Sequence, residues 1–366
     1  MALTRKMKRQ IGGLVILTLV VYALVLLTGN FRSHYREFVE FKWGWLPVAI
    51  VLVTVNFVLR EWKWDFFRRR AGVEAPRMPS ALIFFSGYSM CLSPGKVGEL
   101  IKPVMYKEYL NQPLSKTIPL CFCERLTDLL GMVVVGGATF YTFVHGVRGK
   151  GIGEAGAASA GTGGGLSVNA TTLLFFLIGS IVLLGAIIAV ARNRRMAHGM
   201  LDFLTRISGI QFHFAGVRFR STRLAGIAKH LRDLYDSTYS LLTAYNLTTM
   251  SLFAAFSWSF EGCATYIISR YGLGIEAVTL PHVLFIFCLA SIVGGLFFFI
   301  PVGGFEAVML ACYALLGASG QVCTILTRLA TAFYGVAFGV VAIVLTTRCF
   351  HKAVQWDELE QMAQQD

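Results

Sequence analysis

The chain has 366 residues, of which 55% are hydrophobic and only 14% are charged, and its mean hydropathy is +0.63. Soluble domains carry about 25% charged residues, so this composition excludes an ordinary soluble protein and predicts an all-α polytopic membrane protein. The net charge of +13 would suit a nucleic-acid partner, but the basic residues gather in short segments between apolar runs. That is the positive-inside pattern, so we expect no nucleic-acid partner and an attraction to anionic lipids.

The N-terminal region predicts a membrane anchor followed by a second span. Basic residues precede an apolar run at 11–28, which is longer than the apolar region of about 7–15 residues in a signal peptide. A second span is predicted at about 43–60. It ends in a basic loop that contains Arg60 and Lys63 and extends to residue 79. The alternation of loop charge places the N-terminus and residues 61–79 in the cytoplasm.

Residues 80–110 are predicted to form a broken hairpin. Pro94, Gly95, Gly98 and Pro103 interrupt this stretch, and each apolar piece is shorter than the roughly 20 residues of a full crossing. A re-entrant hairpin that enters and leaves on the cytoplasmic side is the simplest interpretation. Two full crossings would return the chain to the same side, so loop charge does not separate these alternatives.

The middle of the chain predicts three spans and a linker. The third span is expected at 117–145. Residues 151–168 are rich in glycine but lack the lysine followed by serine or threonine of a Walker loop, so a linker on the outer face is favoured over a phosphate-binding loop. Spans at 170–191 and 245–268 follow, and the basic segment 192–223 between them is expected in the cytoplasm.

The C-terminal part repeats the earlier pattern. A second broken hairpin is predicted at 279–318 and a last span at 321–347, before a cytoplasmic tail at 349–366. The chain then contains a first repeat, 1–150, and a second repeat, 169–348. Each repeat has three full crossings, an odd number, so the second must be inverted relative to the first. The prediction is six full spans plus two re-entrant hairpins in an inverted-repeat transporter layout.

The first break carries the most informative charges. Lys96, Glu99 and Lys102 lie beside Gly98, and a glycine-rich break lets backbone N–H groups and the lysines approach an anionic headgroup. The alternative is that these lysines lie at the interface and extend their charged ends to water. Without a lipid, Lys96 or Lys102 needs a counter-ion, and Glu306 in the second hairpin is the candidate.

The start of the third span holds a compact charge cluster. Glu124 and Asp128 share a helix face at i,i+4, and Arg125 can pair with Asp128 at i,i+3. A structural ion cluster that locks this helix to the hairpin and a proton or ligand site remain equally open.

The second half contributes a matching set of polar residues. Glu306 follows the pair Gly303 and Gly304, and Arg328 in the last span is its candidate partner. Glu261 has no partner nearby in sequence and could carry a proton, because ionisable groups at membrane depth usually serve function. The two glycines are expected to line the substrate site with the residues of the first break.

Catalytic and metal-binding motifs are not visible. The sequence lacks the G-x-S-x-G, H-E-x-x-H and Walker patterns and any Cys or His spacing typical of a metal site. We therefore expect a transporter rather than an enzyme, without a cofactor or a metal.

Three motifs resemble those of one membrane family. Residues 94–99 with Lys102 resemble the P-G-x-x-G-E-x-x-K/R signature of the flippase-like membrane domain family, which includes the membrane region of lysylphosphatidylglycerol synthases. Glu124-Arg125 with Asp128 resembles its E-R-x-x-D signature. Residues 301–306 and the later Arg328 resemble its C-terminal P-G-G-x-G-x-x-E and arginine, although the glutamate follows the glycines more closely here. The resemblance covers about residues 10–347.

The resemblance implies a multi-pass protein of a bacterial or archaeal plasma membrane, with cytoplasmic termini. It implies the movement of an anionic lipid or a polyprenyl-phosphate-linked substrate between leaflets, and it does not imply lysyl transfer. Membrane lipids are then the expected partners. The alternative is a non-transporting scaffold for a lipid-modifying enzyme or glycosyltransferase. The sequence alone does not distinguish the lipid, the direction, the energy source or the oligomeric state.

Overall fold

The computed structural model describes residues 31–91, 100–149, 237–296 and 303–350, with a few isolated positions between 178 and 234. Every regular element in these ranges is helical, which confirms the predicted all-α class. The predictions for the first span (11–28), the linker (151–168), most of the fourth span (170–191) and nearly all of the tail (349–366) lie outside the described residues.

Both long and short helices make up the first half. In chain order they are α2 (Phe31–Glu40), α3 (Trp45–Arg70), α4 (Arg77–Ser86) with the short η1 (Gly87–Met90), α5 (Ile101–Leu110) and α6 (Leu114–Gly149). Helices α4 and α5 have 10 residues each, a rise of about 15 Å, which is half the hydrocarbon thickness of about 30 Å. They pack against each other on either side of the first break.

The second half has the same sequence of long and short helices. Its elements are α11 (Ala244–Ile267), η3 (Ile268–Gly272), α12 (Leu280–Leu296), α13 (Gly304–Leu315), α14 (Gln321–Arg328), η4 (Leu329–Phe333) and α15 (Tyr334–Phe350). The shorter apolar helices α12 and α13 pack against each other on either side of the second break. Among the described residues, two helical stretches are long and apolar enough to cross a membrane, Trp45–Arg70 and Gln321–Phe350.

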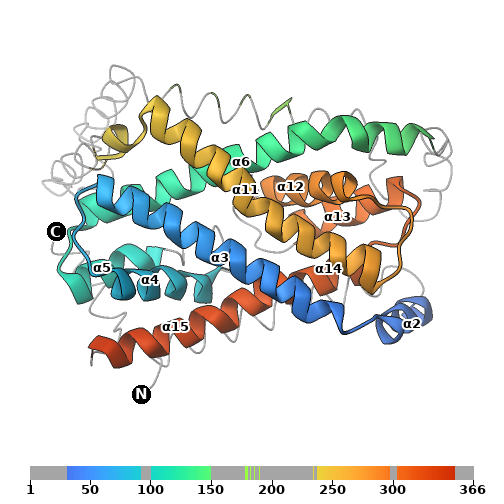
Figure 1. The fold of residues 1–366 in the computed structure, drawn as a ribbon, viewed down its shortest axis with the longest axis horizontal. Helices are drawn as coiled ribbons and strands as arrows, with labels where there is room; N and C mark the ends of the chain where they lie inside the picture. Colours follow the sequence, from blue (N-terminus) through green and yellow to red (C-terminus); the bar gives the residue numbers. More distant parts are fainter. Residues whose placement is uncertain are drawn as a thin grey trace, which may run out of the picture.

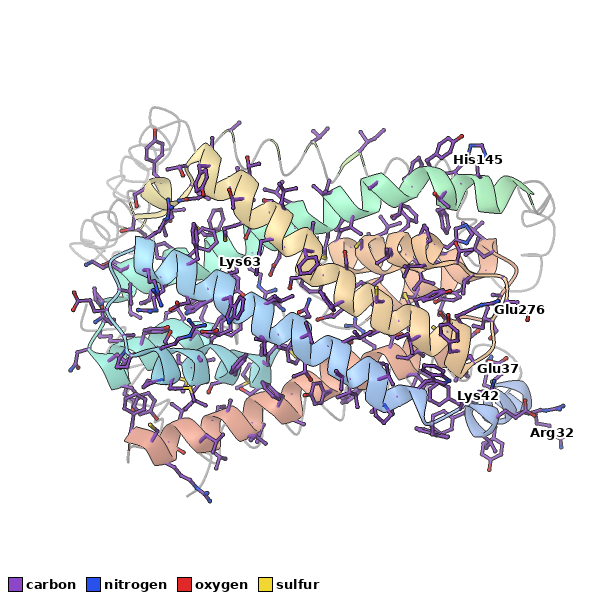
Figure 2. The ribbon with its side chains drawn as sticks, in the orientation of Figure 1. Arg32, Glu37, Lys42, Lys63, His145 and Glu276 are labelled. Atoms are coloured by element: carbon purple, nitrogen blue, oxygen red, sulfur yellow. The ribbon has the colours of Figure 1, made fainter. Side chains whose placement is uncertain are left out.

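Helix α3 continues beyond its predicted end. The expected span stopped at residue 60, yet the helix reaches Arg70 and ends where Gly72 adopts a left-handed conformation (φ 64°). The basic residues expected in a loop are therefore helical, and Arg60 and Lys63 are buried. Figure 2 shows Lys63 within the bundle, whereas the charged residues Arg32, Lys42 and Glu276 lie together at one end.

Helices α3 and α11 cross the molecule side by side in opposite directions (Figure 1). At one end the Arg70 guanidinium donates to the Asn246 side-chain oxygen over 2.6 Å. At the other end the rings of Trp45 and Tyr271 stack with centroids 5.1 Å apart. Helix α6 packs against α12, and α15 packs against α4 and η1, so each half supports the broken segment of the other.

The crossing of α6 and α11 depends on a glycine, and this yields a first prediction. A Cβ at Gly131 would lie 2.6 Å from the Ala255 backbone nitrogen, whereas a Cβ at Gly137 on the same helix would meet nothing within 4 Å. Gly131→Ala is expected to destabilise the protein by about 1–3 kcal/mol, because backbone cannot yield to the added methyl group. Gly137→Ala should be neutral or slightly stabilising, because alanine favours a helix by up to about 1 kcal/mol. Thermal unfolding of the detergent-purified variants measures both effects, and equal stabilities would contradict the close crossing.

Candidate functional site

A buried ionic network joins α3, α5 and α6. Glu124 accepts hydrogen bonds from the Arg60 guanidinium over 3.0 Å and from the Lys102 ammonium over 2.5 Å. One turn further along α6, Asp128 pairs with Lys63 and lies 3.2 Å from Arg60. All five side chains are at most 5% exposed. Such a network is retained only when each charge has a partner, because an uncompensated buried charge costs several kcal/mol.

Aromatic rings complete the surroundings of Lys102. Its ammonium lies 4.5 Å from the ring centroid of Trp64 and 4.8 Å from that of Phe84. Its aliphatic stem passes close to Gly87, where a Cβ would come within 2.9 Å of the lysine side chain. The cation therefore lies between a carboxylate and two π faces, which together replace the water lost on burial.

The second break has its own ion pair. Gly303 adopts φ 126°, a conformation suited to glycine, and its backbone N–H donates to the Glu306 carboxylate over 2.7 Å. The other carboxylate oxygen accepts from the Arg328 guanidinium over 2.7 Å. Arg328 also lies over the Phe305 ring, 3.9 Å from its centroid. Glu306 thus caps α13, which begins at Gly304, and links it to α14.

A cavity of about 130 Å³ lies between the two halves. Tyr88 and Cys91, which immediately precede the first break, form part of its wall. Gly294 and Phe305, on either side of the second break, form another part. Among the described residues, the charged members of the wall are Arg60, Arg125, Glu261 and Arg328. A smaller cavity shares Arg60, Tyr88 and Arg125 with the first and reaches Lys102 and Glu124.

The residues singled out from the sequence fall into four groups. Lys96, Gly98 and Glu99 lie outside the described residues. Lys102, Glu124 and Asp128 belong to the ionic network, while Gly303, Gly304 and Glu306 form the capped start of α13. Arg125, Glu261 and Arg328 line the cavity.

The ion-pair partners predicted for Arg328 and Lys102 can be compared with those in the structure. The expected pairing of Glu306 with Arg328 is observed. The counter-ion suggested for Lys102 was also Glu306, and the structure instead pairs Lys102 with Glu124. The reason is that α5 packs directly on α6 within the first half, so the nearest carboxylate comes from the adjoining helix.

Sequence reasoning missed Arg60, Lys63, Tyr88 and Trp258. The two cations were assigned to a loop because they follow the apolar stretch of α3. Their spacing to Phe67, at i, i+3 and i+7, is typical of one helix face, and all three are buried. That periodicity was the available signal. Tyr88 and Trp258 carried no signal of their own, because aromatic residues are common in apolar helices.

The described ranges contain no group of three His, Cys, Asp or Glu side chains placed to hold a metal ion. The arrangement can instead do two things chemically. It can hold an acidic group through guanidinium and lysine donors, and it can couple the first broken segment to α3 and α6 through the shared carboxylate of Glu124.

Comparison with known protein families shows to which family this chain belongs. The sequence profile described as the lysylphosphatidylglycerol synthase TM region matches residues 10–342. The chain belongs to this family. The match spans both halves and includes the two broken segments and the ionic network, so the predicted resemblance is confirmed. A comparison with individually curated proteins found no match.

Membership of the lysylphosphatidylglycerol synthase TM region family identifies this chain as a membrane protein of a lipid-related family. The buried charges fit that setting, because ionisable side chains at membrane depth face the interior of the bundle and pair with one another. The cavity between the halves is a place where a polar ligand could bind, because Arg60, Arg125 and Arg328 line it.

Proposed function

We propose that the protein is a lipid flippase, which moves an anionic lipid or a polyprenyl-phosphate-linked substrate between leaflets without catalysing a reaction on it. The observation that carries the proposal is the cavity between the ends of the two broken segments, where three guanidinium groups face one internal space. An acidic headgroup that leaves water needs such donors, because a desolvated charge without partners is costly.

The arrangement of the halves supports a transport mechanism. The order of a long helix, two short broken helices and a further long stretch occurs twice, and α3 and α11 run antiparallel. The packing of α6 on α12 corresponds to that of α15 on α4. Inverted repeats with broken helices at their interface are typical of transporters that expose one site alternately to the two sides. We extend this proposal to six full spans, two re-entrant hairpins and cytoplasmic termini in a plasma membrane.

A second prediction tests transport directly. Purified protein in liposomes, with no other protein present, should move a fluorescent anionic lipid between leaflets. Lys96→Ala and Glu99→Gln should reduce this rate to that of protein-free liposomes while leaving the yield and the elution profile of the protein unchanged. The reason is that the first break is proposed to receive the headgroup as it enters.

Two outcomes would count against the proposal. A purified wild-type protein that moves no lipid would favour the alternative of a scaffold for a lipid-modifying enzyme or glycosyltransferase. Loss of folded protein in both variants would assign these two residues a structural role instead.

A further inference from the structure

Three hydrogen-bond donors in the cavity wall have no acceptor among the described residues. They are the Arg60 Nε–H, the Trp258 indole N–H and the Tyr88 hydroxyl. The three residues are 4%, 7% and 9% exposed, so bulk water does not satisfy them. Buried polar atoms are nearly always paired in folded proteins, and exceptions call for an explanation.

The chemistry of these three donor atoms indicates which kind of acceptor group would satisfy them. An indole N–H and a guanidinium Nε–H can donate but cannot accept a hydrogen bond. A single group that satisfies them must therefore offer several acceptor atoms close together. The donors are also held in place, because the Arg60 guanidinium lies 5.4 Å from the Tyr88 ring centroid and 5.0 Å from that of Trp258. Its NH2 group is occupied by Glu124, so the guanidinium connects the ionic network to the cavity.

Charge favours an anionic acceptor. Among the described residues, the network, the cavity wall and the ion pair of the second break contain five cations, namely Arg60, Lys63, Lys102, Arg125 and Arg328. The same described parts contain four carboxylates, namely Glu124, Asp128, Glu261 and Glu306. Five minus four leaves one more cation than carboxylate in this described set. Glu261 lies on a wall that also carries three arginines.

Size narrows the class of anion. An apolar protein cavity of about 150 Å³ holds one benzene, a group of six heavy atoms. The present cavity of about 130 Å³ therefore suits a phosphoryl group of five heavy atoms, and a sugar or an aminoacyl group attached to the phosphate would need further space. A phosphate monoester presents three unesterified oxygens to the three donors, whereas a diester presents two.

We propose that this cavity binds the phosphate monoester group of a lipid through Arg60, Tyr88 and Trp258. This inference rests on the proposed function, since it names the class of headgroup that the same site would carry. A lipid diester such as phosphatidylglycerol has only two unesterified oxygens, so one oxygen would have to accept from two of the three donors. Such a lipid would also place its second substituent against the wall of the cavity.

The test compares three probes on the full-length protein in phosphatidylcholine nanodiscs. They are phosphatidic acid as a lipid monoester, phosphatidylglycerol as a lipid diester, and inorganic phosphate. Binding is measured by native mass spectrometry and by ligand-dependent thermal stabilisation. Phosphatidic acid should bind about tenfold more tightly than phosphatidylglycerol, because it offers each donor its own oxygen and carries no second substituent, and a difference of about 1.4 kcal/mol corresponds to tenfold.

Two variants remove donors while keeping an aromatic ring. Tyr88→Phe and Trp258→Phe should each weaken the binding of phosphatidic acid about tenfold. Without lipid, the unfolding temperature of Tyr88→Phe should equal or exceed that of the wild type, because the deleted hydroxyl has no partner to lose. Trp258→Phe also removes buried ring atoms, so its unfolding temperature should be lower.

Tyr106→Phe is the matched control for these variants. The Tyr106 hydroxyl accepts from the Trp64 indole over 2.9 Å and lies 2.5 Å from the Ser80 hydroxyl. Its removal should lower the unfolding temperature and leave the affinity for phosphatidic acid unchanged. Tyr88→Phe should lower affinity and not stability, and Tyr106→Phe should lower stability and not affinity. This contrast distinguishes a ligand contact from a structural one.

Several results would overturn the inference. Equal affinity for the two lipids would remove the monoester preference, and unchanged affinity in Tyr88→Phe and Trp258→Phe would remove the donors from the site. Inorganic phosphate that binds as tightly as phosphatidic acid would identify free phosphate as the ligand and exclude the lipid. Monoester binding that depends on both donors, in a protein that moves no lipid in liposomes, would leave the inference standing and reject the flippase. Transport of phosphatidylglycerol with no monoester preference would support the flippase and reject the monoester inference.

Discussion

Glu124→Ala is expected to prevent the accumulation of folded protein, or to destabilise it by about 3–5 kcal/mol. The carboxylate is fully buried and neutralises two cations on different helices, Arg60 on α3 and Lys102 on α5. Its removal leaves Lys102 buried beside two aromatic rings without its carboxylate. A loss of this size is comparable with the total stability of many domains, about 5–15 kcal/mol. Fluorescence-detected size-exclusion chromatography and thermal unfolding in detergent would measure it.

Two control variants make this result specific. Glu40→Ala removes an ion pair of 2.7 Å with Arg36, in which both side chains are more than half exposed, and it should change stability by less than about 1 kcal/mol. The double variant Glu124→Ala with Lys102→Met removes one charge of each sign and should recover part of the lost stability. Wild-type stability in Glu124→Ala alone would contradict the network described here.

A reversible cross-link between Cys91 and the last helix is expected to stop transport. The Cys91 sulfur lies 3.7 Å from the carbonyl oxygen of Ala332, and both residues line the cavity. Ala332→Cys, with the other native cysteines replaced, should form a disulfide on oxidation, because the Cys91 sulfur already lies against the backbone of residue 332. The bond would tie the start of the first break to η4, and alternating access requires these parts of the two halves to move relative to each other. Lipid movement in liposomes should fall to background and return on reduction.

The control for this experiment is the same background without Ala332→Cys, which should be insensitive to oxidation. Transport at the wild-type rate in fully cross-linked protein, verified by its mass, would show that this contact persists throughout the transport cycle. The moving part would then have to lie elsewhere in the molecule.

The sequence predicted those features that depend on local spacing. Composition predicted the all-helical class. The placement of Glu306 after two glycines and of Arg328 one helix later predicted an ion pair that the structure contains. Proline and glycine, which interrupt helices for reasons local to the backbone, also predicted the two breaks, and the central residues of these breaks lie outside the described residues.

The remaining features depend on contacts between distant elements. Lys102 pairs with Glu124 rather than Glu306 because α5 packs on α6, and periodicity along one segment carries no information about its neighbour. Arg60 and Lys63 were taken for loop residues because charge usually marks the end of a span. They lie inside the helix, since carboxylates on α6 supply the partners that make burial tolerable. Tyr88 and Trp258 become informative only when their polar atoms are found in one cavity wall.

The distribution of the ion pairs along the chain has a consequence for biosynthesis. The pairs of the network join residues between 60 and 128, and the pair Glu306 with Arg328 lies entirely in the second half. A chain inserted from its N-terminus can therefore bring the opposite charges of α3, α5 and α6 together before the second half has been synthesised. Each half can then form these ion pairs before it packs against the other half. The later half adds apolar packing and the far wall of the cavity, which includes Glu261.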